Sequence, residues 1–406
     1  MQKRHILCIG KHCAILQKPL AHFTDTTLCI KIEYTMAPLR VLMMGGYRCG
    51  KTSALASLFD QTIHGSIKEH FTISDTTKVQ ERDGERIESL CNKRLEIINY
   101  IERGEHNTFL ADQASTQNFW DYKLKVQVPE TNRKMEIIFR DSPGSFFDSE
   151  GQHHYAEIVN YLRDCDVFIV FVDTPYMMEG TTAEKKAANV TDSINSLLTQ
   201  IDTTKAKQVI FVPVKCEKWV KEGKIDEVTE AVEKLYSTTI TALKAIDNIE
   251  ISIIPVETAG DIIFEELREP YLLNDMRNRC CKITDKVVAL SNGKLHRLTD
   301  NKQLFDDPNA IYPGTNITRR NAWYRLRHEP KAQYTPHNCE QILLHILKFI
   351  SKRVIKEIKF GGPIDILFHH MLVEKLHTAS DILDTIHDNK LIKENCEGIK
   401  ILKPLQ

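Results

Sequence analysis

From residue 39 onward, short runs of apolar residues alternate with longer stretches of mixed apolar and polar residues. The apolar runs have the length of a β-strand and are continuous, which is typical of strands buried on both faces of a parallel sheet. The stretches between them show the spacing of amphipathic helices. Strands that alternate with helices in this way predict an α/β fold with a doubly wound, mostly parallel sheet. The predicted buried strands are residues 39–44, 167–172, 209–214 and 251–256, and the predicted helices include 51–63, 181–202 and 224–246.

Other segments add detail to this pattern. Residues 122–128 and 135–139 alternate as strands do, and the turn 129–133 would join them as a hairpin. Residues 77–103 are charged, with apolar positions near helical spacing, and predict a long helix within a helical insertion at 77–112. The pattern weakens after residue 260, so we expect an irregular insertion at 261–335 that contains a hairpin around Asn292-Gly293.

These segments divide the chain into three parts. We expect an N-terminal extension at 1–37, an enlarged α/β domain at 38–356 that closes with a helix at 337–356, and a small α+β tail at 357–406. The tail would hold two short helices and a terminal strand or hairpin. Two interpretations of the extension stay open: either Met36 is the translational start and the preceding segment is poorly ordered, or that segment is an extra hairpin packed on the core.

Composition excludes several classes of partner. The chain has 54 basic and 55 acidic residues and a net charge of −1, so bulk electrostatics predict neither a nucleic-acid partner nor an anionic membrane. Its 11 cysteines lack zinc-site spacing, and the N-terminus lacks a secretory signal, so we expect reduced thiols in a cytoplasmic protein. No apolar run approaches the ~20 residues needed to span a bilayer.

A glycine-rich segment follows the first predicted strand and precedes a helix. It matches the P-loop pattern G-x-x-x-x-G-K-[ST] in the context that the motif requires. In such a loop, backbone N–H groups surround the β-phosphate, the lysine Lys51 neutralises the β/γ oxygens, and the Thr52 hydroxyl ligates Mg²⁺. The residues expected to bind nucleotide here are Gly45, Gly46, Tyr47, Arg48, Cys49, Gly50, Lys51, Thr52 and Ser53.

A second motif, D-x-x-G, runs from Asp141 to Gly144 at the end of a predicted strand. A carboxylate at this place can hold Mg²⁺ through water, and the glycine N–H can contact the γ-phosphate. Upstream of that strand, Thr116 is the candidate for the threonine that ligates Mg²⁺ in small GTPases, with Ser115 and Thr108 as competitors. The predicted metal-binding residues are therefore Thr52, Asp141 and Thr116.

The segment from Val214 to Glu217 lies at the end of the predicted strand that begins at Val209, where GTPases carry N-K-x-D. Lys215 is kept, and Glu217 replaces the aspartate whose carboxylate accepts hydrogen bonds from guanine N1–H and N2–H. Adenine lacks this donor pair, so a buried acceptor selects guanine. After the last predicted strand, Thr258 and Ala259 stand where GTPases place a loop whose backbone N–H contacts guanine O6.

The order of these motifs resembles that of P-loop GTPases of the translation-factor-related (TRAFAC) class. Segments 212–219, 312–314, 319–324 and 338–341 look like the bacterial double-GTPase family, whose members are often encoded beside a second GTPase and are associated with multi-gene conflict or defence systems. The P-loop is also similar to that of guanylate-binding proteins, through Tyr47 and Arg48; in those proteins the loop arginine folds inward during hydrolysis. One departure is Ser145, at a position where many small GTPases carry the glutamine that orients water.

The resemblance implies an enzyme that hydrolyses GTP to GDP and phosphate with Mg²⁺ and has a protein partner, such as a second GTPase or another copy of itself. The catalytic candidates are Lys51, Arg48, Thr116 and Gly144. Arg48 either supplies charge to the γ-phosphate or points outward and pairs with an acidic residue. Two other hypotheses stay open: a nucleotide-dependent binding module with negligible turnover, and an ATPase or P-loop kinase.

Overall fold

In the computed structural model the described residues fall in two compact units, Met1–Tyr34 and Thr35–Gln406. In the first unit, β1 (His5–Ile9) pairs antiparallel with β2 (His12–Leu16), so the N-terminal extension contains a hairpin. The structure describes residues 5–9, 12–16, 38–46, 49–78, 80–82, 85–87, 89–103, 118–129, 131, 133–147, 155–268, 288–291, 294–297, 323–328, 332–360 and 366–405.

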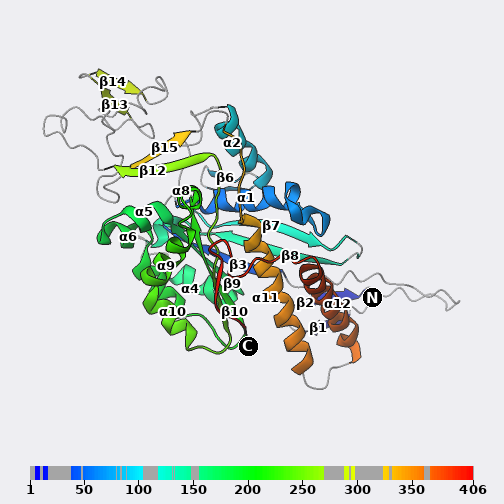
Figure 1. Cartoon of the computed structure of the whole chain (residues 1–406). Coiled ribbons are helices and arrows are strands. Elements are labelled where there is room, and N and C mark those ends of the chain that lie inside the picture. Colours follow the sequence, from blue (N-terminus) through cyan, green and yellow to red (C-terminus); the bar gives the residue numbers. More distant parts are fainter. Residues whose placement is uncertain are drawn as a thin grey trace. The chain divides into compact units, whose positions relative to one another are not determined.

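An eight-stranded sheet forms the centre of the second unit, in the order β16-β11-β10-β9-β3-β8-β7-β4 (Figure 1). The five strands from β11 to β8 are parallel, and β16, β7 and β4 are antiparallel to their neighbours. This topology confirms the predicted doubly wound, mostly parallel α/β fold. The strands are β3 (Leu39–Met44), β4 (Thr72–Asp75), β7 (Trp120–Gln127), β8 (Lys134–Asp141), β9 (Val167–Asp173), β10 (Lys207–Val214), β11 (Ile249–Ile253) and β16 (Lys400–Lys403).

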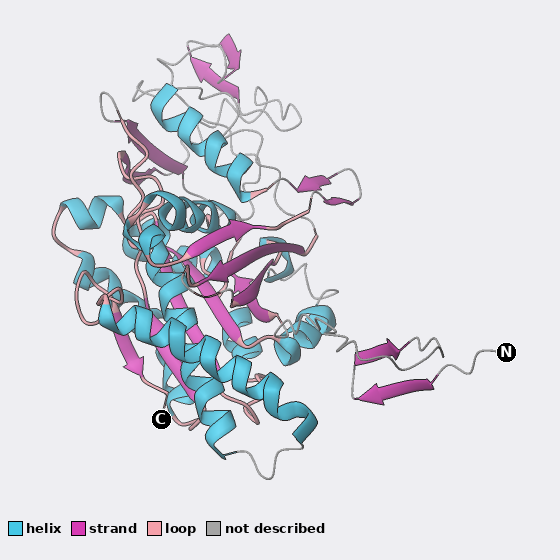
Figure 2. Ribbon diagram, turned by 90° about the vertical axis from the view of Figure 1, so that its right-hand side faces the viewer, coloured by secondary structure: helices cyan, strands magenta, loops and turns pink. Residues whose placement is uncertain are grey.

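Helices cover both faces of this sheet (Figure 2). Alternate residues of a strand point to opposite faces, and accordingly Val41 of β3 packs in one apolar cluster and Leu42 in another. The first cluster includes side chains of α1, α11 and α12, and the second those of α4, α7, α9 and α10. The helices are α1 (Lys51–His64), α2 (Leu90–Arg103), α4 (Tyr155–Asp164), α5 (Thr174–Glu179), α6 (Thr182–Ala188), α7 (Thr191–Leu198), α8 (Glu217–Lys221), α9 (Ile225–Leu235), α10 (Ser237–Lys244), α11 (Cys339–Phe360) and α12 (Ile366–Asp388), with short 3₁₀ turns η1 (Ser66–Glu69) and η2 (Gly144–Phe147).

The predicted long helix at 77–103 is wrong in its first half. β5 (Gln80–Arg82) pairs antiparallel with β6 (Glu85–Ile87), and only Leu90–Arg103 is helical. The last paired residues leave two residues between the strands, and the sequence there is Asp-Gly, which strongly favours a two-residue hairpin turn. Strand β4, which was not predicted, precedes this hairpin.

Two other predicted helices are divided. The segment 181–202 forms α6 and α7, with Val190 between them at a left-handed φ of 44°, and 224–246 forms α9 and α10. Two short helices were predicted in the tail, whereas its described residues hold the end of α11 and one long helix, α12, of 23 residues; the predicted terminal strand is present as β16. β16 pairs with β11, so this tail extends the central sheet.

The described part of the segment 261–335 contains two strand pairs. β12 (Ile262–Arg268) pairs with β15 (Trp323–His328), and β13 (Val288–Ser291) pairs with β14 (Lys294–Arg297), which confirms the hairpin predicted around Asn292-Gly293. Among the described residues, no helix has both the length and the apolar character required to cross a bilayer.

Candidate nucleotide-binding site

The P-loop connects the end of β3 to the start of α1. Gly45 and Gly50 have φ values of 153° and 106°, which side chains with a Cβ rarely adopt. A Cβ on Gly45 would also lie 2.9 Å from the carbonyl oxygen of Phe171 on the neighbouring strand β9. Both glycines are therefore required for the path of the loop. Tyr47 and Arg48 lie outside the described residues.

Lys51 is the first residue of α1, and only 7% of its surface is exposed. Its Nζ donates hydrogen bonds to the carbonyl oxygens of Gly45, at 3.1 Å, and Gly46, at 3.3 Å. The ammonium group is thus held inside the curve of the loop, next to the N-terminus of α1. A fixed positive charge at a helix N-terminus favours the binding of phosphate groups.

Thr52 and Asp141 meet where β3 and β8 end side by side. Thr52 Oγ1 donates a hydrogen bond of 2.7 Å to Asp141 Oδ2, and Met43 of β3 is in register with Asp141 of β8. Asp141 is 1% exposed, and its Oδ1 has no hydrogen-bond partner among the described residues. Burial raises the pKa of the Asp141 carboxyl, while the nearby Lys51 charge and the Thr52 hydrogen bond lower it. A buried carboxylate oxygen that no described residue contacts by a hydrogen bond, beside a hydroxyl group, fits a Mg²⁺ ion, which prefers oxygen ligands.

The turn after Asp141 is anchored to β3. The Ser142 hydroxyl donates a hydrogen bond to the carbonyl oxygen of Met43, and the buried Gly144 begins the 3₁₀ turn η2. The structure therefore places the D-x-x-G segment beside the P-loop. The proposed threonine ligand Thr116 lies outside the described residues, so its place in this site stays a prediction.

Lys215 follows β10 with a left-handed φ of 62°. Its Nζ donates a hydrogen bond of 2.9 Å to Asp173 Oδ2, and its Cε would be 3.8 Å from a Cβ placed on Gly50. Asp173 is the last residue of β9 and is fully buried. Asp173 was not among the predicted site residues. The sequence nevertheless carried a signal for a site residue here, because Asp173 lies at the carboxyl end of a parallel strand beside the P-loop strand, where ligands bind in such folds.

Glu217 begins α8 and is 2% exposed. Its Oε1 accepts hydrogen bonds from the backbone N–H groups of Thr258, at 2.8 Å, and Ala259, at 2.9 Å. Burial raises the pKa of the Glu217 carboxyl to about 7, although the backbone N–H groups lower it in part. The structure thus brings together Glu217, Thr258 and Ala259, three of the four residues that the sequence assigned to the nucleotide base, and it shows that Glu217 contacts the other two.

Comparison with known families decides the classification. The model of the Double-GTPase 2 family matches residues 40–261, which is more than half of the 406 residues. The chain belongs to the Double-GTPase 2 family. The matched range of this double-GTPase contains the P-loop, Asp141, Lys215, Glu217 and the loop of Thr258 and Ala259. No curated protein sequence matches the chain significantly.

Solved structures with a similar chain trace include the GTPase-like domain of S. cerevisiae Ski7 and a signal recognition particle receptor complex. Ski7 bound to GDP and inorganic phosphate has 15% sequence identity and a TM-score of 0.31, and the match covers 55% of this chain and 44% of that one. Ski7 bound to GTP has 12% identity and a TM-score of 0.33, with 55% and 43% covered. The SRb-GTP/SRX complex from Chaetomium thermophilum has 15% identity and a TM-score of 0.30, with 56% and 94% covered. The double-GTPase thus matches less than half the length of the Ski7 chains.

Proposed function

We propose that this double-GTPase binds GTP and GDP with Mg²⁺ and hydrolyses GTP to GDP and phosphate. The observation that carries the proposal is the meeting of Lys51, Thr52 and Asp141 at the ends of β3 and β8. A buried ammonium, a hydroxyl and a carboxylate oxygen that has no hydrogen-bond partner in the described part of the chain are the groups that a triphosphate and its metal require. Membership in a GTPase family supports the same assignment.

In this proposal the chain acts mainly by positioning charge. Lys51 neutralises the β/γ-phosphate oxygens at the N-terminus of α1, and Thr52 and Asp141 would hold the metal, with Thr116 as the predicted third ligand. Mg²⁺, when bound, supplies positive charge that stabilises the phosphate oxygens during transfer. The N–H of Gly144 and the residue Thr116 would orient the attacking water, and Arg48 would supply further charge.

Guanine selection is assigned to Glu217. As a carboxylate, Glu217 can accept hydrogen bonds from guanine N1–H and N2–H, and adenine would leave this buried acceptor facing another acceptor. The N–H groups of Thr258 and Ala259 donate to Glu217 Oε1 and so orient this carboxylate towards the base; the predicted contact of an N–H group with guanine O6 would require one of these hydrogen bonds to be exchanged. Lys215, held by Asp173 beside Gly50, would lie against the base.

One observation favours a second candidate function, a nucleotide-dependent binding module with negligible turnover. Ser145 occupies the position after D-x-x-G, where many small GTPases carry glutamine. Hydrolysis would then depend on a group supplied by a partner, such as a second GTPase or another copy of this chain. Such a protein would act as a switch in a multi-protein system, in line with the resemblance to proteins of bacterial conflict systems.

The test is the substitution Lys51→Ala, with the exposed Lys68→Ala of η1 as its matched control. We expect Lys51→Ala to weaken GTP and GDP affinity at least tenfold, which is about 1.4 kcal/mol, and Lys68→Ala to bind as the wild type does. Wild-type affinity in Lys51→Ala would refute the P-loop assignment. Single-turnover hydrolysis by the wild type, alone and with added partner, separates the enzyme from the binding module.

A further inference from the structure

The loop of residues 257–260, which would lie near the base, pairs with a segment more than seventy residues further along the chain. Glu257 and His337 exchange two backbone hydrogen bonds, of 3.1 and 3.0 Å, and Gly260 forms a second bridge to Tyr334. Residues 334–337 thus run antiparallel to residues 257–260. The loop's position therefore depends on how this second segment is held.

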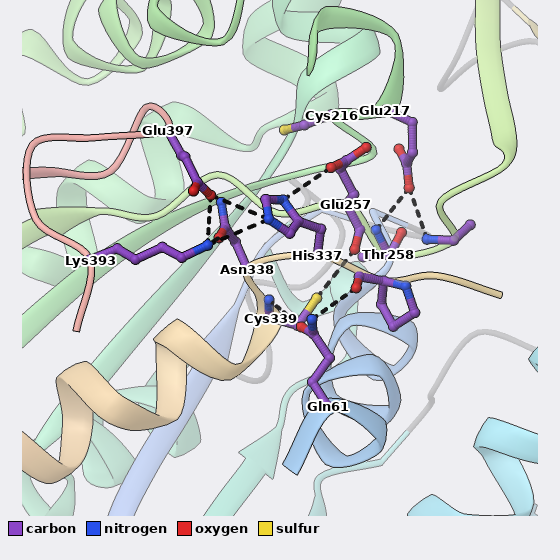
Figure 3. A network of polar contacts seen from close by, with 12 residues as sticks. Gln61, Cys216, Glu217, Glu257, Thr258, His337, Asn338, Cys339, Lys393 and Glu397 are labelled. Carbon is purple, nitrogen blue, oxygen red and sulfur yellow. Dashed lines mark hydrogen bonds and ion pairs between the residues drawn. The ribbon is translucent and has the colours of Figure 1, made fainter. Parts of the chain in front are cut away.

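The side chain of His337 connects this loop to residues 393–397, the C-terminal segment (Figure 3). Its Nδ1 lies 3.2 Å from Glu257 Oε1, and its Nε2 lies 3.3 Å from Glu397 Oε2. Lys393 Nζ lies 2.7 Å from the same Glu397 oxygen and donates a hydrogen bond of 3.0 Å to Asn338 Oδ1. A contact chain therefore runs from residues 393–397 through His337 to Glu257, the residue just before Thr258.

The P-loop helix supports the other side of both segments. Ser57 Oγ donates a hydrogen bond of 2.8 Å to the carbonyl oxygen of Thr258. Gln61 Nε2 donates one of 2.8 Å to the carbonyl oxygen of Pro336, and Gln61 Oε1 accepts one of 2.7 Å from the Cys339 N–H (Figure 3). Because α1 is held by the sheet and the P-loop, the network places the base loop at a fixed position relative to the phosphate site.

We propose that His337 and Lys393 are positioning residues for base recognition. Through these two side chains, the C-terminal segment, residues 393–397, influences the affinity for guanine nucleotides. These side chains act through Glu257, which keeps the N–H groups of Thr258 and Ala259 opposite Glu217. The inference rests on the proposed function, because it assigns a role to the loop in reading guanine. It predicts a loss confined to nucleotides with a guanine base, since Lys51 and Thr52 are oriented by hydrogen bonds to Gly45, Gly46 and Asp141, none of which involves His337 or Lys393.

The charge on His337 gives the inference a specific signature. A protonated imidazole can donate to Glu257 and Glu397 at once, whereas a neutral one can donate to only one of them. The hydrogen bond with Glu257 raises the pKa of His337, and the nearby Lys393 charge lowers it. The contribution to guanine affinity is therefore full at low pH and is lost as the pH rises through the pKa of His337.

Other charged groups surround the same histidine. A cavity of about 480 Å³ beside His337 is also lined by His70, Glu340, Lys390 and Lys393, from the segment after η1, from α11, from the residues after α12 and from the C-terminal segment. Removal of one charge close to His337 should therefore move the midpoint of its titration in a direction set by the sign of that charge. Lys393→Met should raise this midpoint, and Glu397→Gln should lower it.

The experiment measures GDP and ADP affinity of the full chain between about pH 6 and about pH 8, with the unfolding midpoint of each variant. His337→Gln should weaken GDP binding about tenfold at the lower pH, leave ADP binding unchanged, and remove the part of the wild-type pH dependence in which GDP affinity falls as the pH rises. The titration of Glu217, whose pKa burial raises to about 7, affects both proteins alike. His387→Gln, whose side chain is 88% exposed on α12, is the matched control and should bind as the wild type does. The variants Lys393→Met and Glu397→Gln should move the pH profile in opposite directions.

The outcomes that overturn the inference differ from those that overturn the proposed function. If the wild type binds GDP and ADP equally, base recognition itself is absent and the proposed function fails. If the wild type prefers GDP but His337→Gln matches His387→Gln, the positioning role is refuted. Equal losses of GDP and ADP affinity in His337→Gln, together with a lower unfolding midpoint, would show a general structural role and would also refute it.

Discussion

The Oε1 atom of Glu217 lies 2.8 Å from the backbone nitrogen of Thr258, across a separation of 41 residues. This contact joins the start of α8 to the loop after β11, at the carboxyl ends of neighbouring parallel strands. One oxygen of the carboxylate is thus oriented by the backbone of the loop. A rigidly held acceptor discriminates between bases more strongly than a mobile one, because it cannot adapt to the wrong partner.

The first prediction concerns Glu217→Gln. The amide oxygen can still accept from Thr258 and Ala259, but the amide N–H₂ would face the guanine N1–H and N2–H donors. We expect the preference for GTP over ATP to fall by ~10²-fold with little loss of stability. Competition binding measures the preference, and the exposed Glu230→Gln of α9 is the control. Unchanged selectivity would show that Glu217 does not read the base and would favour the ATPase hypothesis.

The second prediction uses the pH dependence of stability. The pKa of Glu217 rises from 4.5 to about 7 on burial, so the folded protein binds more protons than the unfolded chain between these values. The free energy of unfolding should therefore decrease as the pH rises through this range, by an amount on the order of 3 kcal/mol for this group. Urea denaturation of the nucleotide-free protein over this range should show a steeper decrease for the wild type than for Glu217→Gln. Parallel curves would contradict the shift.

The sequence was sufficient for those parts of the site that depend on local chemistry. The P-loop and the D-x-x-G turn are contiguous motifs whose strand and helix context can be recognised directly, and Lys51, Thr52 and Asp141 are brought together by the structure. Glu217 was identified from its position after a strand. Its contact with Thr258 could not be read from the sequence, because the contact depends on the order of strands in the sheet.

The parts that sequence reasoning missed depend on long-range pairing. The terminal strand was predicted, but its pairing with β11 was not, because nothing in the four residues of β16 specifies that partner. The network of Ser57, Gln61 and His337 joins segments far apart in the chain, so no local pattern marks it. At 77–89 the local signal existed, since Asp83-Gly84 favours a hairpin, but the apolar spacing of the following helix was extended too far upstream.

The third prediction concerns Gly260→Ala. Gly260 has a φ of 78°, and a Cβ there would lie 2.7 Å from the carbonyl oxygen of Thr335. We expect a loss of roughly 1–3 kcal/mol in the free energy of unfolding, together with weaker preference for guanine. Gly223→Ala is a matched control, because its φ is 68° but a Cβ there would meet nothing within 4 Å. Chemical denaturation of both variants separates the backbone strain, which they share, from the steric contact. Equal losses of unfolding free energy in the two variants would show that the contact with Thr335 adds no destabilisation.

The last prediction concerns catalysis by Arg48. This residue lies in the P-loop, outside the described residues, at the place where guanylate-binding proteins keep an arginine. Ser145 stands where many small GTPases carry the water-orienting glutamine, so the proposed hydrolysis would need another group near the γ-phosphate. A guanidinium in that position can accelerate hydrolysis by ~10³–10⁵-fold in GTPases. If Arg48 supplies it, Arg48→Ala should keep GTP affinity within a few fold and should lower turnover by more than tenfold.

The measurement is single-turnover GTP hydrolysis at saturating enzyme, with any partner present, and the exposed Arg163→Ala of α4 is the control. Saturation matters because it removes differences in affinity, so that the rate reports only the charge at the γ-phosphate. A charge that acts on the transferring group changes the rate constant and leaves the dissociation constant nearly unchanged. An outward-pointing arginine paired with an acidic residue changes neither. Equal turnover in the two variants and the wild type would exclude Arg48 as the catalytic charge and would assign hydrolysis to a group supplied in trans.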